Sequence, residues 1–298
     1  MTKSVMGSDP CSGLAADGVS FAYRGGEPVL IGVNAEIPRG GLVGILGPNG
    51  SGKTTLLRIL GGLLTPSSGR VTLDGQHLRS ISRATIARRM AMVPQETQLA
   101  FEYGVLEMAM MGRYPHLGAF EIEGPGDLAI ARDALRATGT LHLESRLFNT
   151  LSGGEKQRVV IAGALAQLEE RGREGFSNAP RENPSRPRSS DILLLDEPTA
   201  SLDLAYQLEI RSILHTLNAE RGLTIVVSTH DLNLAAGLCR DLILLDRGRI
   251  LAAGPTQSIL EPSLIRKLYG VDVDIARNAR TGHLTVVPVA RSTELPLP

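Results

Sequence analysis

Apolar residues along this chain form short strand-like runs that are separated by helix-like spacings. The run from Leu42 to Leu46 leads into a glycine-rich stretch and then into the helix-forming run from Thr54 to Leu60. Further apolar runs at Ile192 to Leu195 and Thr224 to Ser228 each end in polar residues. Such runs are typical of a parallel sheet whose functional groups lie at the carboxyl ends of its strands. The pattern therefore predicts an α/β fold that opens with strand, loop and helix.

The remaining segments differ in pattern. Residues 14 to 36 predict short strands with a turn at Arg24-Gly25-Gly26, while residues 97 to 168 show mainly helical periodicity. Residues 169 to 190 are polar and rich in Arg, Pro, Ser and Gly, which indicates a solvated or flexible insertion. The expected division is an N-terminal antiparallel β-subdomain with the first part of the core (1–96), a helical subdomain (97–168), the insertion (169–190), the second part of the core (191–275), and a C-terminal strand and tail (276–298).

Composition narrows the functional classes. The 298 residues include 42% hydrophobic residues, enough for a core, and 31 basic residues balance 31 acidic ones. Because no net charge attracts nucleic acid, we expect no nucleic-acid partner. Cys11 and Cys239 match neither a disulfide framework nor a metal-site spacing. A membrane span needs about 20 apolar residues, and the sequence has no such stretch and no secretory leader, so we expect any membrane association to come through a partner.

A phosphate-binding loop is the strongest motif. The string Gly47-Pro48-Asn49-Gly50-Ser51-Gly52-Lys53-Thr54 matches G-x-x-x-x-G-K-[ST] and has a strand before it and a helix after it. Glycines allow backbone N–H groups to surround phosphate oxygens, and the helix N-terminus favours their negative charge. We expect Lys53 to reach the β and γ phosphates and the Thr54 hydroxyl to bind Mg²⁺. The predicted nucleotide-binding residues here are Gly47, Asn49, Gly50, Ser51, Gly52, Lys53, Thr54 and Thr55.

A second motif carries two adjacent carboxylates. Asp196 and Glu197 follow the buried run from Ile192 to Leu195, and neighbouring residues of a strand point in opposite directions. They are therefore expected to have different roles. Asp196 is predicted to hold Mg²⁺, and Glu197 to orient or deprotonate the attacking water. Taken alone, such a pair could equally be a helix-capping turn; the phosphate loop upstream favours hydrolysis.

A third motif, Leu151-Ser152-Gly153-Gly154-Glu155-Lys156-Gln157-Arg158, stands just before a long helical run. Ser152, Gly153 and Gly154 at a helix start can form a second anion site, although a simple helix cap is the alternative. With this string the chain resembles the ATPase subunits of the ABC transporter family, whose characteristic motif is LSGGxxQR. The resemblance implies that this motif of one subunit closes over the γ-phosphate of ATP held by the phosphate loop of a second subunit.

Four further positions fit the same family. The resemblance implies that Tyr23 stacks on adenine, that Gln95 contacts Mg²⁺ or the attacking water, and that His230 contacts the γ-phosphate. It also implies that Asp203, in Ser201-Leu202-Asp203, belongs to a loop that crosses the dimer interface. A strand tyrosine is more often only packed, and a lone histidine is usually structural, so the order of the motifs along the chain supports these roles.

The resemblance extends from about Leu14 to Pro288, with two departures. Gly163 stands where the family usually has arginine, and a glycine within a helix costs up to about 1 kcal/mol. The segment 169 to 190 is longer than the short link that usually leads to the second acidic motif in this family. Within Phe101 to His116, the methionines Met108, Met110 and Met111 suit either a permease-docking surface or a core, and this stretch resembles importers of iron–siderophore complexes, haem or cobalamin.

The resemblance implies a P-loop NTPase (RecA-like) core with an inserted helical subdomain, and ATP and Mg²⁺ as ligands. It further implies a homodimer, a separate transmembrane permease and an indirect link to a substrate-binding protein, with the subunit at the cytoplasmic face of the membrane. The alternative is a soluble ABC ATPase associated with nucleic acid or ribosomes. The sequence shows neither the long coiled-coil insertion nor the second module that are typical of those classes.

Overall fold

The computed structural model of the chain describes residues 13–97, 99–170, 191–200 and 202–291. The described residues form two compact units. Unit 1 contains the residues up to Ser80 and those from Val226 onward, and unit 2 runs from Ile81 to Ile225. Cys11, Ser201, the C-terminal tail and residues 171–190 of the expected insertion lie outside the described residues.

Unit 1 begins with an antiparallel sheet in the order β2-β1-β4-β5. β1 and β2 are joined by the expected turn at Arg24 to Gly26, but they are 10 and 11 residues long rather than short. Their length follows from cross-strand pairing, which runs from Gly13 opposite Pro38 to Ala22 opposite Pro28. The strands are β1 (Gly13–Ala22), β2 (Pro28–Pro38), β4 (Ser68–Leu73) and β5 (Gln76–His77), and the short helix η1 (Leu78–Ser80) follows them.

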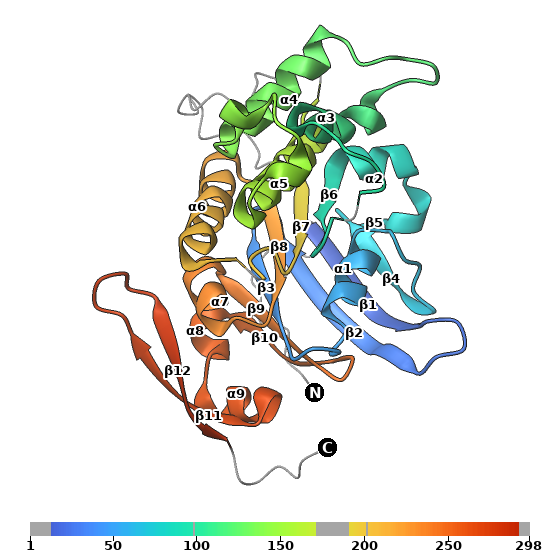
Figure 1. Cartoon of the computed structure of the whole chain (residues 1–298). Coiled ribbons are helices and arrows are strands. Elements are labelled where there is room, and N and C mark those ends of the chain that lie inside the picture. Colours follow the sequence, from blue (N-terminus) through green and yellow to red (C-terminus); the bar gives the residue numbers. More distant parts are fainter. Residues whose placement is uncertain (1–12, 98, 171–190, 201, 292–298) are drawn as a thin grey trace. The chain divides into compact units, whose positions relative to one another are not determined.

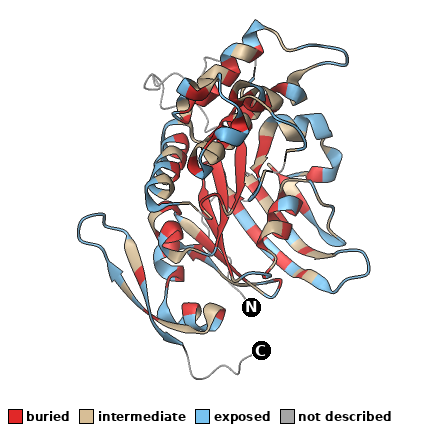
Figure 2. Cartoon of the chain, in the orientation of Figure 1, coloured by how far each residue is buried: buried red, intermediate tan, exposed pale blue. Residues whose placement is uncertain are grey.

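The second sheet of unit 1 positions the phosphate loop. β3 (Leu42–Leu46) has the predicted bounds, pairs in parallel with β9 (Asp241–Asp246) and is completely buried. Figure 2 shows the buried residues gathered along the central strands. α1 (Lys53–Leu60) begins one residue before the predicted helix. The other elements here are β8 (Thr224–Thr229), whose first two residues belong to unit 2, α7 (Leu232–Leu238), β10 (Arg249–Pro255) and α8 (Thr256–Ile259).

A hairpin ends unit 1 (Figure 1). The sequence predicted one C-terminal strand, but β12 (Leu284–Arg291) is paired with β11 (Val271–Arg277). Asp272 and Asp274 alternate with the apolar residues of β11, which is the pattern of a half-exposed strand, so β11 could have been predicted from the sequence. Helix α9 (Pro262–Tyr269) precedes the hairpin and buries Ile265 and Leu268.

Unit 2 carries a second pair of parallel strands. β6 (Met90–Val93) pairs with β7 (Ile192–Asp196) in the register Val93 to Leu195. The described part of residues 97 to 168 contains helices joined by loops and one isolated bridge, and the helices agree with the predicted periodicity. The helices of unit 2 are α2 (Arg83–Arg89), α3 (Val105–Met110), η2 (Met111–His116), α4 (Pro125–Ala137), η3 (Leu141–Leu143), η4 (Phe148–Thr150), α5 (Gly153–Leu168) and α6 (Leu204–Arg221).

Gly163, the departure from the family pattern, lies where α5 meets η2. A Cβ atom on Gly112 would be 2.1 Å from the backbone oxygen of Gly163 and 2.9 Å from the nitrogen of Gln167. A Cβ atom on Gly163 would in turn be 3.1 Å from the backbone oxygen of Met108. The two glycines therefore let two backbones approach closely, and this contact offsets the lower helix propensity of glycine.

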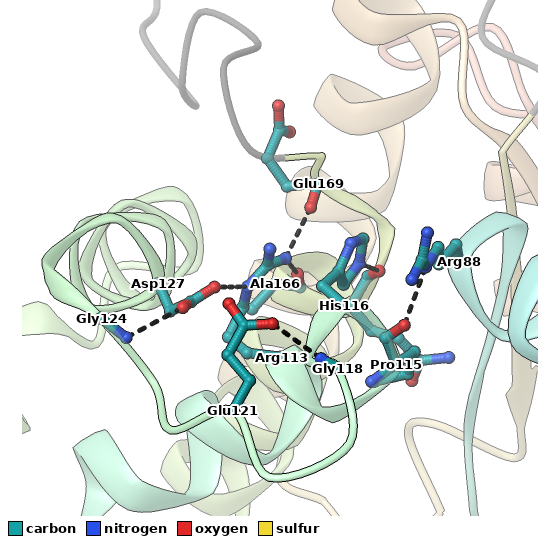
Figure 3. A network of polar contacts seen from close by, with 11 residues as sticks. Arg88, Arg113, Pro115, His116, Gly118, Glu121, Gly124, Asp127, Ala166 and Glu169 are labelled. Carbon is teal, nitrogen blue, oxygen red and sulfur yellow. Dashed lines mark hydrogen bonds and ion pairs between the residues drawn. The ribbon is translucent and has the colours of Figure 1, made fainter.

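Arg113 is the centre of a buried polar network in unit 2 (Figure 3). Its side chain and that of Asp127 are both 0% exposed, and Arg113 Nε donates to Asp127 Oδ1 at 3.1 Å. Arg113 Nη1 donates to the carbonyl oxygens of Ala166 and Glu169 at the end of α5. Asp127 Oδ2 also accepts the backbone N–H of Gly124 and so caps the start of α4. One ion pair thus joins the ends of two helices.

His116 supports the same end of α5. Its Nε2 lies 2.7 Å from the carbonyl oxygen of Gln167, and burial lowers the pKa of the imidazole. The side chain of Gln167 donates to the carbonyl oxygens of Ala87 and Met90, which adds α2 and β6 to the junction. The C-terminal end of α5 is therefore fixed by hydrogen bonds with residues of other elements of unit 2.

Candidate functional site

The phosphate loop of unit 1 is a tight backbone cradle. A Cβ atom on Gly47 would lie 2.3 Å from the oxygen of Leu245 and 2.5 Å from Ser51 Oγ, so only glycine fits there. Gly52 has φ 105°, a backbone conformation that favours glycine, and it precedes α1 without a side-chain cap. No acidic residue stands in the first turn of α1. The positive end of this helix therefore faces the loop, and the first turn of the helix adds no carboxylate of its own.

The interior of the loop is cationic. Lys53 is 6% exposed, and its Nζ donates to the carbonyl oxygens of Gly47 and Pro48 at 2.9 and 3.2 Å. Ser51 Oγ is buried and has no hydrogen-bond partner among the described residues. A buried ammonium and a buried hydroxyl within a glycine cradle are the groups that phosphate oxygens require. The loop residues thus fit the predicted ligand.

Tyr23 is hydrogen-bonded to α1, the helix that follows the loop. Its hydroxyl lies 3.2 Å from Thr55 Oγ1, and its ring meets Phe21 edge to face with centroids 4.9 Å apart. Tyr23 remains 45% exposed. The ring is thus held on two sides and still presents surface, which is compatible with both adenine stacking and the packing alternative.

In unit 2, Gln95 and the acidic pair follow paired strands. Because β6 and β7 run in parallel with Val93 opposite Leu195, Gln95 and Glu197 each stand two residues beyond that pair. They therefore emerge at the same edge of the sheet. Asp196 is the last residue of β7 and is 3% exposed, whereas Gln95 is exposed and Glu197 is half-buried.

Glu197 has an unusual backbone. Its φ of 46° is in the left-handed region, which residues other than glycine seldom adopt. The chain turns directly after the strand, and the backbone N–H of Ala200 closes this turn on the oxygen of Glu197. Non-glycine residues in such conformations concentrate at functional sites. The sequence analysis expected the two carboxylates to differ through strand alternation, but Glu197 lies outside β7, and its surroundings differ from those of Asp196 because of this turn.

The LSGG motif begins α5 and forms a capping box. Ser152 Oγ accepts the N–H of Glu155, and Glu155 Oε2 accepts the N–H of Ser152 at 2.8 Å. This bond from the Ser152 backbone is the main reason that the pKa of Glu155 is lowered. The simple helix cap, which the sequence left as an alternative, is therefore present, and Ser152 and Gly153 are nevertheless exposed.

Gly154 has a packing role that sequence reasoning missed. A Cβ atom there would lie 2.2 Å from the ring of Tyr206 on α6. Tyr206 also receives a hydrogen bond of 3.4 Å from Ser152 Oγ, and a Cβ on Gly153 would touch Leu202 at 3.3 Å. The LSGG motif thus lies beside the start of α6, where the exposed residue Asp203 directly precedes the helix.

His230 lies in unit 1, directly after β8, and is exposed. Asp231 caps the next helix, because its Oδ1 accepts the N–H groups of Asn233 and Leu234 at 2.8 and 3.0 Å. The Asp231 N–H in turn donates to Thr229 Oγ1. His230 therefore stands on a short loop whose two ends are fixed.

The methionines within Phe101 to His116, called the methionine segment below, differ in how far they are buried. Met108 is buried, as the core alternative expects, while Met110 and Met111 are half-buried, and the docking alternative stays a prediction. Phe101 and Tyr114, at either end of the segment, are 74% and 58% exposed. Single exposed apolar side chains are common and only a contiguous patch marks a contact site, so these two residues are candidates for such a site.

Neither a membrane-spanning helix nor a metal-binding cluster is found among the described residues. Within these ranges, none of the helices combines the length and apolar character of a membrane span. Nor does this part of the chain hold a cluster of three or more His, Cys, Asp and Glu side chains placed for a metal ion. Mg²⁺ in nucleotide sites needs only one or two protein carboxylates beside the phosphates, so the predicted ligands remain compatible with it.

The chain is similar to several known proteins. Residues 30–170 match the family model described as ABC transporter. The hemin import ATP-binding protein of Bordetella pertussis is 39% identical over 89% of this chain and 95% of its own length. The ferric enterobactin transport ATP-binding protein of Escherichia coli is 35% identical over 98% of this chain and 97% of its own. The cobalamin import ATP-binding protein of Halobacterium salinarum is 37% identical, and the chain spans only 62% of its length.

Solved structures agree. An inward-facing structure of a putative metal-chelate type ABC transporter contains a chain with a TM-score of 0.76 and 27% identity, covering 94% of this chain and 98% of its own. A dimeric bacterial ABC transporter cassette has a TM-score of 0.65 and 30% identity, covering 82% of this chain and 98% of its own. The fold is that of the ABC ATPase cassettes, which confirms the predicted α/β class, and the chain belongs to the ABC transporter family.

Proposed function

We propose that this chain is the ATP-binding and ATP-hydrolysing subunit of an ABC importer whose cargo is an iron chelate, haem or cobalamin. The observation that carries the proposal is the phosphate cradle around Lys53, in a chain similar along most of its length to hemin and ferric enterobactin import proteins. The cargo class comes from the names of these relatives. The alternative, a soluble ABC ATPase unconnected with transport, has no comparable support.

In this proposal the loop from Gly47 to Thr55 holds the phosphates and Tyr23 holds the adenine. Thr54, Asp196 and Gln95 would bind Mg²⁺, which neutralises charge on the phosphates. Glu197 orients or deprotonates the attacking water, and His230 contacts the γ-phosphate. The left-handed turn at Glu197 and the exposed loop at His230 are compatible with these roles.

The proposal also includes a homodimer with two shared sites. Ser152, Gly153 and Gly154 would close over ATP held by the second copy, with Asp203 in the interface. Ser152 and Gly153 are exposed at the start of α5, where the helix dipole favours an anion. The dimeric cassette among the similar structures supports this arrangement.

The permease is the remaining proposed partner. A separate transmembrane protein would dock near Phe101 and Tyr114, whose exposed apolar side chains flank the methionine segment. A substrate-binding protein would act on that permease and not on this chain. The subunit would then work at the cytoplasmic face of the membrane.

Replacing Lys53 by alanine tests the phosphate cradle. We expect the affinity for ATP to fall by roughly tenfold or more, because a charge-assisted hydrogen bond to phosphate contributes about 1.5–3 kcal/mol. Isothermal titration calorimetry with MgATP measures this effect. Lys267→Ala, on the exposed side of α9, is the matched control and should bind like the parent. Equal affinity of the Lys53 variant would exclude the loop as the site.

Purification from membranes tests the partner. The tagged chain, isolated in mild detergent from its own cells, is expected to retain a polytopic membrane protein. Phe101→Glu combined with Tyr114→Glu should lose this protein, since burying a carboxylate in an apolar contact is costly. Val289→Glu, a control at another exposed apolar position, should keep it. Recovery of ribosomes or nucleic acid in place of a membrane protein would favour the alternative function.

A further inference from the structure

The β11–β12 hairpin is a two-stranded sheet among the described residues, and such hairpins are marginally stable unless they pack on something else. The ion pair between Arg266 of α9 and Asp272 of β11 supports its start. Val286 of β12, opposite Ile275, is 2% exposed. The second strand of the hairpin, β12, is therefore also packed against other residues near its start.

Asn233 of α7 provides the polar part of that contact. Its Oδ1 accepts the backbone N–H of Val286 at 2.8 Å, and its Nδ2 donates to the carbonyl oxygen of the same residue at 3.1 Å. One side-chain amide thus binds both backbone groups of a strand residue, as a neighbouring strand would. The edge of β12 is fastened to α7 at this position.

Asn233 lies close to His230 in the sequence, so its contact with β12 bears on the loop that carries His230. Asn233 is the second residue of α7, three positions after His230, and its own N–H is held by the Asp231 cap. The Asp231 N–H is bound in turn to Thr229. His230 therefore stands between the end of the buried strand β8 and a helix start that is fastened to the hairpin.

We propose that Asn233 is a positioning residue for His230, and that the β11–β12 hairpin acts through it to hold the β8–α7 loop in its working geometry. The inference rests on the proposed function for the role of His230 at the γ-phosphate. The hairpin then contributes to turnover without touching nucleotide, because catalytic rates depend on side-chain placement to within about 1 Å.

Asn233→Leu in the full chain tests this role, since leucine is similar in size and cannot make either hydrogen bond. We expect kcat for ATP hydrolysis to fall roughly tenfold and KM for ATP to stay within about twofold, because the phosphate loop and Tyr23 are unchanged. Amide hydrogen exchange should become faster in residues 229 to 235. Asn233→Asp keeps the acceptor for the Val286 N–H and loses the donor, so its kcat is expected to be intermediate.

Asn34→Leu is a closely matched control. Asn34, on β2, also makes two backbone hydrogen bonds through its amide, accepting from Gly18 at 2.8 Å and donating to Gly32 at 3.3 Å. The Asn34→Leu variant should lower thermal stability by about as much as Asn233→Leu does and leave kcat unchanged. An equal loss of kcat in both leucine variants, or parental kcat in Asn233→Leu, would refute the positioning role.

The two proposals fail in different ways. A parental chain that binds no ATP and has no ATPase activity would overturn the proposed function. Hydrogen exchange would still report on the contact in that case: unchanged exchange at residues 229 to 235 in Asn233→Leu would show that the hairpin does not hold this loop.

Discussion

Replacing Arg113 by methionine is expected to lower the free energy of unfolding by about 3–5 kcal/mol, the usual cost of removing one partner from a buried ion pair. Arg113 and Asp127 are both fully buried, and methionine removes the guanidinium charge that pairs with the carboxylate. The carbonyl oxygens of Ala166 and Glu169 would lose a charged donor as well. Urea denaturation followed by circular dichroism at 222 nm measures the change.

The matched control for this prediction is Arg132→Met. Arg132 also pairs with a carboxylate in unit 2, at 2.8 Å from Glu144, but both side chains are partly exposed. Exposed pairs contribute at most about 1 kcal/mol, so this variant should unfold near the parental midpoint. The double variant Arg113→Met, Asp127→Asn should be less destabilised than the sum of its single changes, because neither member of this pair leaves its partner's charge uncompensated. Equal midpoints for Arg113→Met and Arg132→Met would contradict the importance of the network.

Replacing Glu197 by glutamine is expected to lower kcat for ATP hydrolysis roughly 100-fold or more while ATP remains bound. Glutamine has nearly the same size and can occupy the same left-handed turn, but it cannot accept a proton from water. If two copies share their sites, the unhydrolysed ATP should also hold a dimer together. Steady-state ATPase assays and gel filtration with MgATP measure the two effects.

Glu220→Gln, on the exposed end of α6, is the control for the charge change and should keep parental turnover. Parental turnover in the Glu197 variant would remove this residue from the catalytic role. Loss of both ATP binding and turnover would instead indicate that the substitution had disturbed the fold, and thermal unfolding of the variant would show this directly.

The sequence predicted the elements that carry the motifs with small errors. β3 was found with the expected bounds, while β7 and β8 each extend one residue further and α1 begins one residue earlier. These predictions were accurate because a buried strand needs a continuous apolar run and a phosphate loop needs glycines at fixed spacing. The roles of Glu197, His230 and Gln95 came from the resemblance and remain proposals.

Other features could not be predicted from local pattern. β11 has the alternating pattern of a strand, but its antiparallel pairing with β12 is decided only by the fold. Gly154 appeared to be only part of an anion site, whereas the ring of Tyr206 also excludes any side chain there. The sequence gives no sign of the contact between Asn233 and Val286, which lie 53 positions apart.

The sequence by itself determined the family, the phosphate loop and the order of the motifs, because each depends on residue types at short, fixed spacings. Only the tertiary structure decided that Arg113 is buried, since its partners lie 14, 53 and 56 positions further along the chain. It likewise decided that Asn233 fastens the hairpin, since its partner Val286 lies 53 positions away. Burial and hydrogen bonding of a polar side chain depend on which distant segments fold against it, and no local pattern records that.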